Sequence, residues 1–278
     1  MTPTEAVPDV RRAALETMAA EIRIGTSGWH YKHWLGTFYP ADLKTSKMFE
    51  FYQRRFDTVE LNNSFYRLPT PQAFAAWRDS ASPDFQFAVK GSRFLTHNKK
   101  LKEPEQALRN LLPRAEILAE KLGPILFQLP PKWKVNVERL EDFLCALPKY
   151  HRYAFEFREP TWHAEAVYDT LRRHNAAYCI HELAGFHTPI LVTADFAYVR
   201  LHGPGEKYQG CYSDEKLREW AERIAGWSRA LRAIYVYFDN DDSGYAPRNA
   251  LELKERVKAA VGRTISKRRA SKQKHPAA

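Results

Sequence analysis

Residues 58–69 read TVELNNSFYRLP, a short apolar strand that breaks into a polar, aromatic loop. Successive side chains of a strand point to opposite faces, so Val59 and Leu61 share one face while Glu60 and Asn62 share the other. An amide buried without a partner costs roughly 2–7 kcal/mol, so the polar face must meet a polar interior or a ligand. The stretch therefore predicts a strand whose end carries part of a site.

Strands and helices alternate along the rest of the chain. The other predicted strands are residues 22–29, 85–90, 124–130, 152–158, 177–181, 197–205 and 233–240. The predicted helices are residues 45–55, one that starts at Thr70-Pro71, 104–122 (ended by Gly123), 137–147, 161–174, 213–231 and 247–261, while residues 183–194 fit neither pattern. Eight such alternations are typical of an α/β protein with a single (β/α)8 TIM barrel of about 250 residues. A doubly wound open sheet is the alternative, and it is disfavoured because polar residues lie at the same end of nearly every strand.

The polar residues share one parity on these strands, which predicts that they face the barrel interior. The predicted inward set is Glu60, Asn62, Lys90, Gln128, Glu156, Arg158, Cys179, His181, Arg200, His202, Phe238 and Asn240. Their neighbours in sequence are nearly all apolar, as a helix-covered outer face requires. Strand ends of a barrel converge on one mouth, so this segregation predicts a polar pocket there.

Each member of this set also has a purely structural interpretation. Glu156 with Arg158, or Glu60 with Lys90, would form ion pairs that only fill the barrel. Alanine variants of Arg200 and Glu60 separate the two interpretations. A site residue costs mainly ligand affinity when it is removed, whereas one half of a buried ion pair costs roughly 3–5 kcal/mol of stability.

The composition predicts one barrel-sized domain over residues 22–261, since 44% of the 278 residues are hydrophobic. We expect residues 1–21 to form a poorly ordered extension and residues 262–278 a disordered basic tail. That tail holds six of the ten net positive charges: Arg263, Lys267, Arg268, Arg269, Lys272 and Lys274. A tail of this kind is typical of a solvated appendage, and it also adds salt-dependent affinity for polyanions.

The cellular location of the protein is predicted from the charged residues that interrupt its apolar stretches. Asp9, Arg11 and Arg12 stand where a signal peptide needs an uninterrupted apolar stretch, and no later stretch is long enough to cross a bilayer. The three cysteines have no paired short spacing of the zinc or redox type. We therefore expect a cytoplasmic protein with no membrane partner; its oligomeric state and cofactors stay unassigned, and no metal ligands are assigned.

Several motifs in order resemble the YecE-like family, domain of unknown function 72. They are residues 25–40 (GTSGWHYKHWLGTFYP), Glu60-x-Asn62-x-Ser64-Phe65-Tyr66-Arg67-x-Pro69, Phe87-x-Val89-Lys90 with Thr96-His97, Gln128-Leu-Pro130, Glu156-x-Arg158 with Trp162, Arg200-x-His202-Gly203, and Tyr237-Phe238 with Asn240. The resemblance covers residues 22–261. It implies a TIM barrel and a bacterial-type cytosolic protein, and it implies no particular reaction.

The first functional hypothesis is an enzyme that acts on an anionic substrate, such as a phosphorylated sugar, a nucleotide or a nucleic acid. Its anion-binding residues are Lys90, Arg158 and Arg200, with the loop 203–205 nearby. Its acid–base candidates are Glu60 and Glu156, assisted by His181 or His202. Further binding residues are Asn62, His97, Gln128 and Asn240, with Trp29, Tyr31, Phe65 and Tyr66 stacking on a base or sugar; a lid of self-packing aromatics is the alternative for these. Hydrolysis of a phosphodiester is the narrower form.

Two further hypotheses stay open. One is a metal-dependent isomerase or endonuclease-like hydrolase, because glutamate and histidine are suitable ligands, although the cationic neighbours would repel a metal. The other is a non-catalytic module that binds nucleic acid or another polyanion through the basic tail and the aromatic mouth.

Overall fold

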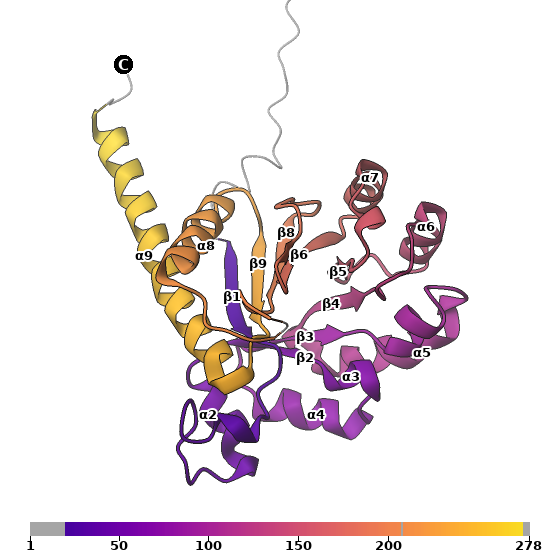
Figure 1. The fold of residues 1–278 in the computed structure, drawn as a ribbon, viewed down its shortest axis with the longest axis horizontal. Helices are drawn as coiled ribbons and strands as arrows, with labels where there is room; N and C mark the ends of the chain where they lie inside the picture. The colour runs from indigo at the N-terminus through magenta and orange to yellow at the C-terminus, as the bar shows by residue number, and fades with distance from the viewer. Residues whose placement is uncertain (1–19, 207, 275–278) are drawn as a thin grey trace, which may run out of the picture.

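The structure, a computed structural model, describes residues 20–206 and 208–274. Its centre is a barrel of eight parallel strands with helices around it, which confirms the predicted (β/α)8 fold (Figure 1). The strands pair in the order β1-β9-β8-β6-β5-β4-β3-β2. They are β1 (Glu21–Thr26), β2 (Thr58–Leu61), β3 (Gln86–Lys90), β4 (Leu122–Gln128), β5 (Tyr153–Glu156), β6 (Ala177–Leu183), β8 (Phe196–Leu201) and β9 (Ala233–Phe238). The predicted extension, residues 1–21, lies outside the described residues except for its last two.

Two helices begin at the capping residues that the sequence predicts. Thr70 Oγ1 accepts a hydrogen bond from the Ala73 N–H at 3.2 Å, and Ser213 Oγ accepts one from the Lys216 N–H, also at 3.2 Å. The helices are α2 (Met48–Gln53), α3 (Asn63–Tyr66), α4 (Pro71–Ser80), α5 (Pro104–Ala115), α6 (Val137–Cys145), α7 (Glu165–Arg173), α8 (Asp214–Trp227) and α9 (Tyr245–Lys274). No helix among the described residues is long and apolar enough to cross a membrane.

Three segments differ from the prediction. The helix predicted over residues 104–122 ends at Ala115, and a 3-10 segment (Glu116–Lys121) follows in which Ala119 has φ 52°. Gly123 is not a helix stop but lies inside β4. The unassigned residues 183–194 contain the short strand β7 (Phe186–His187), which pairs antiparallel with β6.

The C-terminal segment also differs, because α9 continues to Lys274 where a disordered tail was expected from residue 262. Lysine and arginine, which make up six of residues 262–274, are good helix formers, so the helix propagates past the barrel (Figure 1). Arg263 also pairs with Glu222 of α8 at 2.7 Å. Residues 275–278 lie outside the described part of the chain.

The core has two layers that reflect the strand parity. An outer layer between strands and helices includes Phe87, Phe127 and Phe155. An inner layer fills the barrel with mostly small residues from one side and mostly aromatic ones from the other: Ala88, Leu126, Ala154, Ala177 and Cys179 against Phe196, Tyr198, Ala233, Tyr235 and Tyr237. This packed interior forms the floor on which the polar strand ends lie.

The barrel closes between β1 and β2 through a short seam. Ser27 and Glu60 form an isolated parallel bridge, and the Gly28 N–H donates to the Glu60 carbonyl at 2.9 Å. The backbones approach closely just before this bridge. A Cβ placed on Gly25 would lie 2.4 Å from the carbonyl oxygen of Thr58.

We therefore expect Gly25→Ala to lower the free energy of unfolding by about 1–3 kcal/mol, because the backbone at the seam must move to admit the methyl group. The matched control is Gly226→Ala in α8, where a Cβ meets nothing within 4 Å. This control should raise stability by about 0.5–1 kcal/mol, since glycine is the poorer helix former. Urea melts measure both changes, and an unchanged midpoint for Gly25→Ala would show that the seam is not tightly packed.

Candidate functional site

Arg200 on β8 is the centre of a buried cluster at the carboxyl ends of the strands. Its side chain is 1% exposed, and its Nε and Nη2 bind the carboxylate of Glu60 at distances of 2.8–3.1 Å. Nη1 donates to Glu156 Oε2 at 2.7 Å, and Nη2 also lies 3.0 Å from Ser27 Oγ and from Asp239 Oδ2. A guanidinium has five N–H donors, and every nitrogen of Arg200 is therefore engaged inside the protein.

His202 is held in one tautomer by this cluster. Its Nε2 accepts from Arg200 Nη1 at 3.2 Å and from Arg158 Nη2 at 3.3 Å, so the proton belongs on Nδ1. Nδ1 lies 2.9 Å from Asp239 Oδ2. Burial and the charge of Arg200 lower the pKa of His202, which matches a neutral ring. Nδ1 contacts Asp239 at ion-pair distance but without the geometry of a hydrogen bond, and Nε2 accepts from both guanidinium groups, so this histidine is less available as a base than His181.

Two carboxylates of the cluster, those of Glu156 and Asp239, are held ionised. Burial would raise the pKa of Glu156, but Arg158 and Arg200 hold it well below its usual value. Burial acts in the same way on Asp239, and Arg200 followed by His202 lowers its pKa. Arg158 Nε donates to Glu156 Oε1 as well. These contacts make Arg200 and Arg158 a scaffold for buried negative charge.

Lys90 stands apart from these pairs. Its residue is 8% exposed, and among the described residues no carboxylate oxygen lies within 4.0 Å of its ammonium. Its Nζ lies over the ring of Phe65, 4.4 Å from the centroid. Burial, followed by the charge of Arg200, lowers the pKa of Lys90 to about 8. The ammonium of Lys90 therefore feels the charges of Glu156, Glu60 and Asp239 but forms an ion pair with none of them.

His181 is the second group without a partner. It is 1% exposed, and neither Nδ1 nor Nε2 has a hydrogen-bond partner among the described residues. Its ring centroid is 6.1 Å from that of His202, and burial lowers its pKa to about 3, so it is neutral. Asn62 Oδ1 is likewise buried without a partner, while its Nδ2 donates to Ser27 Oγ. Buried polar atoms in native proteins are nearly always satisfied, so these orphan atoms require an explanation.

The other predicted binding residues fall into different places. His97 lies in a π-helical turn (Phe94–Asn98) 5.1 Å from the Phe65 ring, and burial lowers its pKa to about 4. Gln128 is buried beside Glu156 in the β4–β5 register. The Tyr31 hydroxyl donates to the Ser27 carbonyl at 2.7 Å, which places this ring near the cluster.

Two of the predicted stacking residues lie away from the cluster. Trp29 packs against Phe49 and Trp77, with ring centroids 5.2 and 5.9 Å away, so it joins the loop to α2 and α4 in the outer layer. The residue Tyr66 is 79% exposed. Much of the aromatic loop packs on itself, as the Trp34 ring does against Tyr31 at 4.8 Å.

The predicted parity of β9 was wrong. Phe238 belongs to the outer layer, and Asn240 donates to the Gly210 carbonyl at 2.8 Å and to Asn249 Oδ1 at 3.0 Å instead of facing the cluster. Asp239 takes the inward position, because Tyr235 and Tyr237 fill the barrel. The signal was present in the sequence: residues 233–239 alternate tyrosine with isoleucine and valine, and the aliphatic residues belong under the helices.

Sequence reasoning also missed three other residues. Ser27 and Tyr198 hold the carboxylate of Glu60, with the Tyr198 hydroxyl donating to Glu60 Oε2 at 2.6 Å. Tyr198 shares the parity of Arg200, so the strand pattern would have identified it. Asp241 lies just beyond β9, and burial followed by the charge of Asp239 raises its pKa to about 6. Nothing in the sequence indicates that shift.

The described residues do not favour a metal in this cluster. Its carboxylates are engaged by guanidinium groups, and among the described residues one group alone brings three ligand atoms within 4.8 Å of one another, Glu141, Cys145 and His174. That group lies between α6 and α7.

Comparison with known proteins identifies the family. The family model described as "Protein of unknown function DUF72" matches residues 23–275. The chain belongs to the DUF72 family. This confirms the resemblance found in the sequence and extends it beyond residue 261 into the basic end of α9. The DUF72 match covers the barrel and every residue of the strand-end cluster.

Relatives of this DUF72 protein share its sequence over most of their length. It is 24% identical over 252 residues to UPF0759 protein YecE of Escherichia coli (strain K12), covering 81% of this chain and 89% of that one. It is 24% identical over 275 residues to UPF0759 protein YunF of Bacillus subtilis (strain 168), covering 84% and 94%. A solved DUF72 family structure from Thermotoga maritima is 32% identical with a TM-score of 0.78, covering 86% of this chain and 99% of that chain. One from Enterococcus faecalis, 18% identical with a TM-score of 0.74 and coverage of 85% and 95%, shares the fold.

Proposed function

We propose that this DUF72 protein is an enzyme that binds an anionic substrate at the strand ends, with Lys90 and Arg158 as the cations that meet it. The single observation that carries the proposal is that, among the described residues, Lys90 forms no ion pair and the His181 ring no hydrogen bond, in a cluster where the other charged groups are paired. Burying an unpaired cation costs free energy, and a bound anion would offset that cost. Arg200 is not assigned to the substrate because its donors are already engaged.

The placement of two of the cations supports an anion at this position. Three carboxylates (Glu60, Glu156 and Asp239) face two guanidinium groups, and the ammonium of Lys90 offsets the remaining negative charge. The side chain of Arg158 is 9% exposed and the residue Lys90 is 8% exposed, so both keep a little contact with solvent, whereas the Glu60 and Glu156 side chains are fully buried. Cations that keep this contact can meet a substrate that arrives from solvent.

We assign acid–base work to His181. It is neutral and has two free nitrogens, and an anion bound beside Lys90 would favour its uptake of a proton. Hydrolysis of a phosphodiester is the narrower form of the proposal: His181 accepts the proton of the attacking water and returns it to the alkoxide oxygen that leaves as its bond to phosphorus breaks, while Lys90 and Arg158 neutralise the phosphoryl oxygens. Glu60, Glu156 and His202 are then positioning residues that hold Arg200 and Arg158.

The second candidate is a module that binds nucleic acid or another polyanion. The continuation of α9 through Lys274 favours it, because the sequence of residues 262–274 is basic without a single acid. A helical basic segment that runs past the barrel has the reach to follow a phosphate backbone.

A thermal-shift screen tests both candidates. The compounds are sugar phosphates, nucleotides, a dinucleotide phosphodiester and oligonucleotides, tested on the full chain, on Lys90→Met and on a chain ending at residue 261. We expect a phosphorylated compound at 100 times its dissociation constant to stabilise the full and shortened chains by about 2.7 kcal/mol and to leave Lys90→Met unchanged. Stabilisation by oligonucleotides alone, lost on shortening, would favour the polyanion module. No shift with any compound would contradict both.

A further inference from the structure

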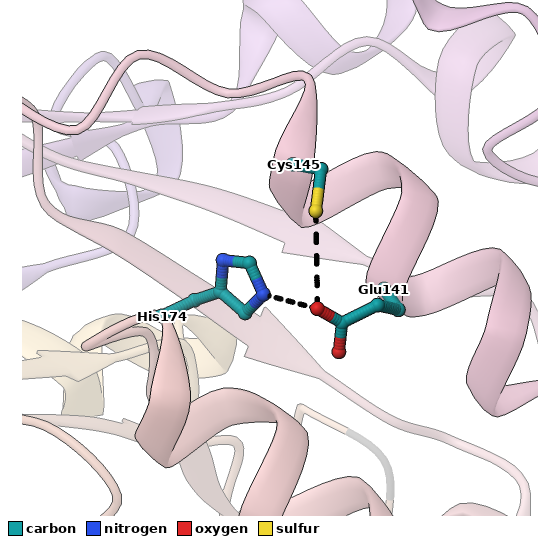
Figure 2. A group of neighbouring side chains, drawn as sticks. All are labelled: Glu141, Cys145 and His174. Carbon is teal, nitrogen blue, oxygen red and sulfur yellow. Dashed lines mark hydrogen bonds and ion pairs between the residues drawn. The ribbon is translucent and has the colours of Figure 1, made fainter.

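We propose that Glu141, Cys145 and His174 form a zinc site that joins the ends of α6 and α7. The three side chains converge from two neighbouring helices (Figure 2). Their ligand atoms all lie within 4.8 Å of one another. This site is separate from the strand-end cluster, and the proposal does not depend on the function assigned to that cluster.

The local geometry follows from helix periodicity. Glu141 and Cys145 are four residues apart on α6, so they occupy one face of that helix, and His174 follows the last residue of α7. Glu141 Oε1 lies 2.6 Å from His174 Nε2 and 3.8 Å from Cys145 Sγ. With bonds of about 2.0–2.1 Å to nitrogen and oxygen and about 2.3 Å to sulfur, a tetrahedral zinc separates its N and O ligands by about 3.3 Å. Cys145 Sγ is already at a suitable distance from Glu141 Oε1, and Glu141 needs to withdraw only slightly from the imidazole.

The ligand set selects the metal. Thiolate and imidazole are soft to borderline ligands that favour Zn2+ or Co2+ over Mg2+ and Ca2+, which require oxygen. Cys145 is exposed and the side chain of Glu141 is 34% exposed, so an ion reaches the site and water completes a fourth position. When the metal binds, the Cys145 thiol loses its proton to solvent and His174 offers the Nε2 lone pair with its proton on Nδ1.

Its place in the barrel indicates a structural role. Helices of a (β/α)8 barrel run back against the strands, so the carboxyl ends of α6 and α7 lie at the amino ends of the strands. His174 indeed precedes the first residue of β6, Ala177, by three positions. The metal would therefore fasten two helices at the end of the barrel opposite the strand-end cluster.

One neighbour opposes the metal. Arg173 Nη2 lies 2.6 Å from Glu141 Oε2, and it also contacts Thr170 Oγ1 at 3.0 Å. The guanidinium occupies the other oxygen of the carboxylate, so Oε1 stays available, but its charge weakens the binding of a second cation. Arg173 thus provides a variant whose expected effect has the opposite sign to that of the ligand variants.

The test is a titration of the reduced, untagged full chain with Co2+, followed by competition with Zn2+. We expect one Co2+ per chain, with a thiolate-to-cobalt charge-transfer band in the near ultraviolet that Zn2+ removes and Mg2+ does not. Cys145→Ser should abolish the band, and Glu141→Gln and His174→Gln should each weaken Zn2+ binding at least about tenfold. Arg173→Ala should strengthen it. Zn2+ should raise the melting temperature of the full chain and leave that of Cys145→Ser unchanged.

Cys211→Ser is the matched control, because Cys211 is half-buried and lies in a different part of the fold. It should keep the charge-transfer band and the affinity. The proposal is overturned if Co2+ gives no charge-transfer band, if the band survives Cys145→Ser, or if Cys211→Ser removes it. The three ligand residues are surface groups, and circular dichroism verifies that each variant is folded.

Discussion

Arg200→Ala is expected to lower the free energy of unfolding by about 3–5 kcal/mol, the largest loss for any single substitution proposed here. The change removes a guanidinium group that contacts Glu60, Glu156 and Asp239 together and leaves three carboxylates around an empty space. Uncompensated buried charge is far more costly than the loss of a favourable contact. Urea denaturation followed by tryptophan fluorescence measures the change.

Arg232→Ala is the matched control. Arg232 is also paired with an acid, Asp195 at 3.4 Å, but its side chain is 62% exposed. The cost there should stay below about 1 kcal/mol, as for other exposed ion pairs. The strand pattern alone allowed both a ligand site and a structural network. If Arg200→Ala proved no more destabilising than Arg232→Ala, the cluster would be a ligand site and not a structural network.

The second large effect is expected at Lys90, and it has the opposite sign. Burial lowers the pKa of Lys90 from 10.5 to about 8, so the folded protein holds this charge at a cost. At about 1.4 kcal/mol per pKa unit, Lys90→Met should raise stability by as much as roughly 3 kcal/mol at pH 7 while it abolishes stabilisation by anions. A variant that loses stability and keeps the response to anions would refute the role assigned to Lys90.

The pH dependence supplies an independent measurement. Between about pH 8 and 10.5 the unfolded chain holds the Lys90 proton that the folded chain has lost, so the stability of the wild-type protein rises across this window. Lys90→Met lacks that rise, and the difference between the two proteins in urea melts should therefore shrink from pH 7 to pH 10. Anion binding should weaken above about pH 8 as the ammonium is lost. Equal pH profiles for the two proteins would contradict the assigned pKa.

The sequence was sufficient for the barrel and for much of the cluster, because both follow from local periodicity. The apolar neighbours of Glu156 and Arg200 determine the faces of β5 and β8. The predicted inward position of Asn240 was wrong because Tyr235 and Tyr237 occupy the inward face of β9, and Asn240 lies on the opposite parity. The membership of the cluster is thus a property of strand parity.

The unpartnered state of His181 was beyond sequence reasoning, since it depends on distances between strands. The same applies to the group on α6 and α7. The spacing of Glu141 and Cys145 is visible in the sequence, whereas the approach of His174 depends on how two helices pack. The packing of Trp29 against Phe49 and Trp77 was also beyond sequence reasoning, because the sequence does not show which neighbours its loop will reach.

The three acids that Arg200 joins come from positions 60, 156 and 239 of the chain, and this spread bears on the order of synthesis. A ribosome releases Glu60 and Glu156 well before Arg200 emerges, and Asp239 and the closing strand β9 follow later still. A nascent half-barrel would have to bury carboxylates without their counter-charge, so it gains little by compacting early. Productive folding therefore waits for the last strands, and the growing chain has reason to remain open until its carboxyl end is free.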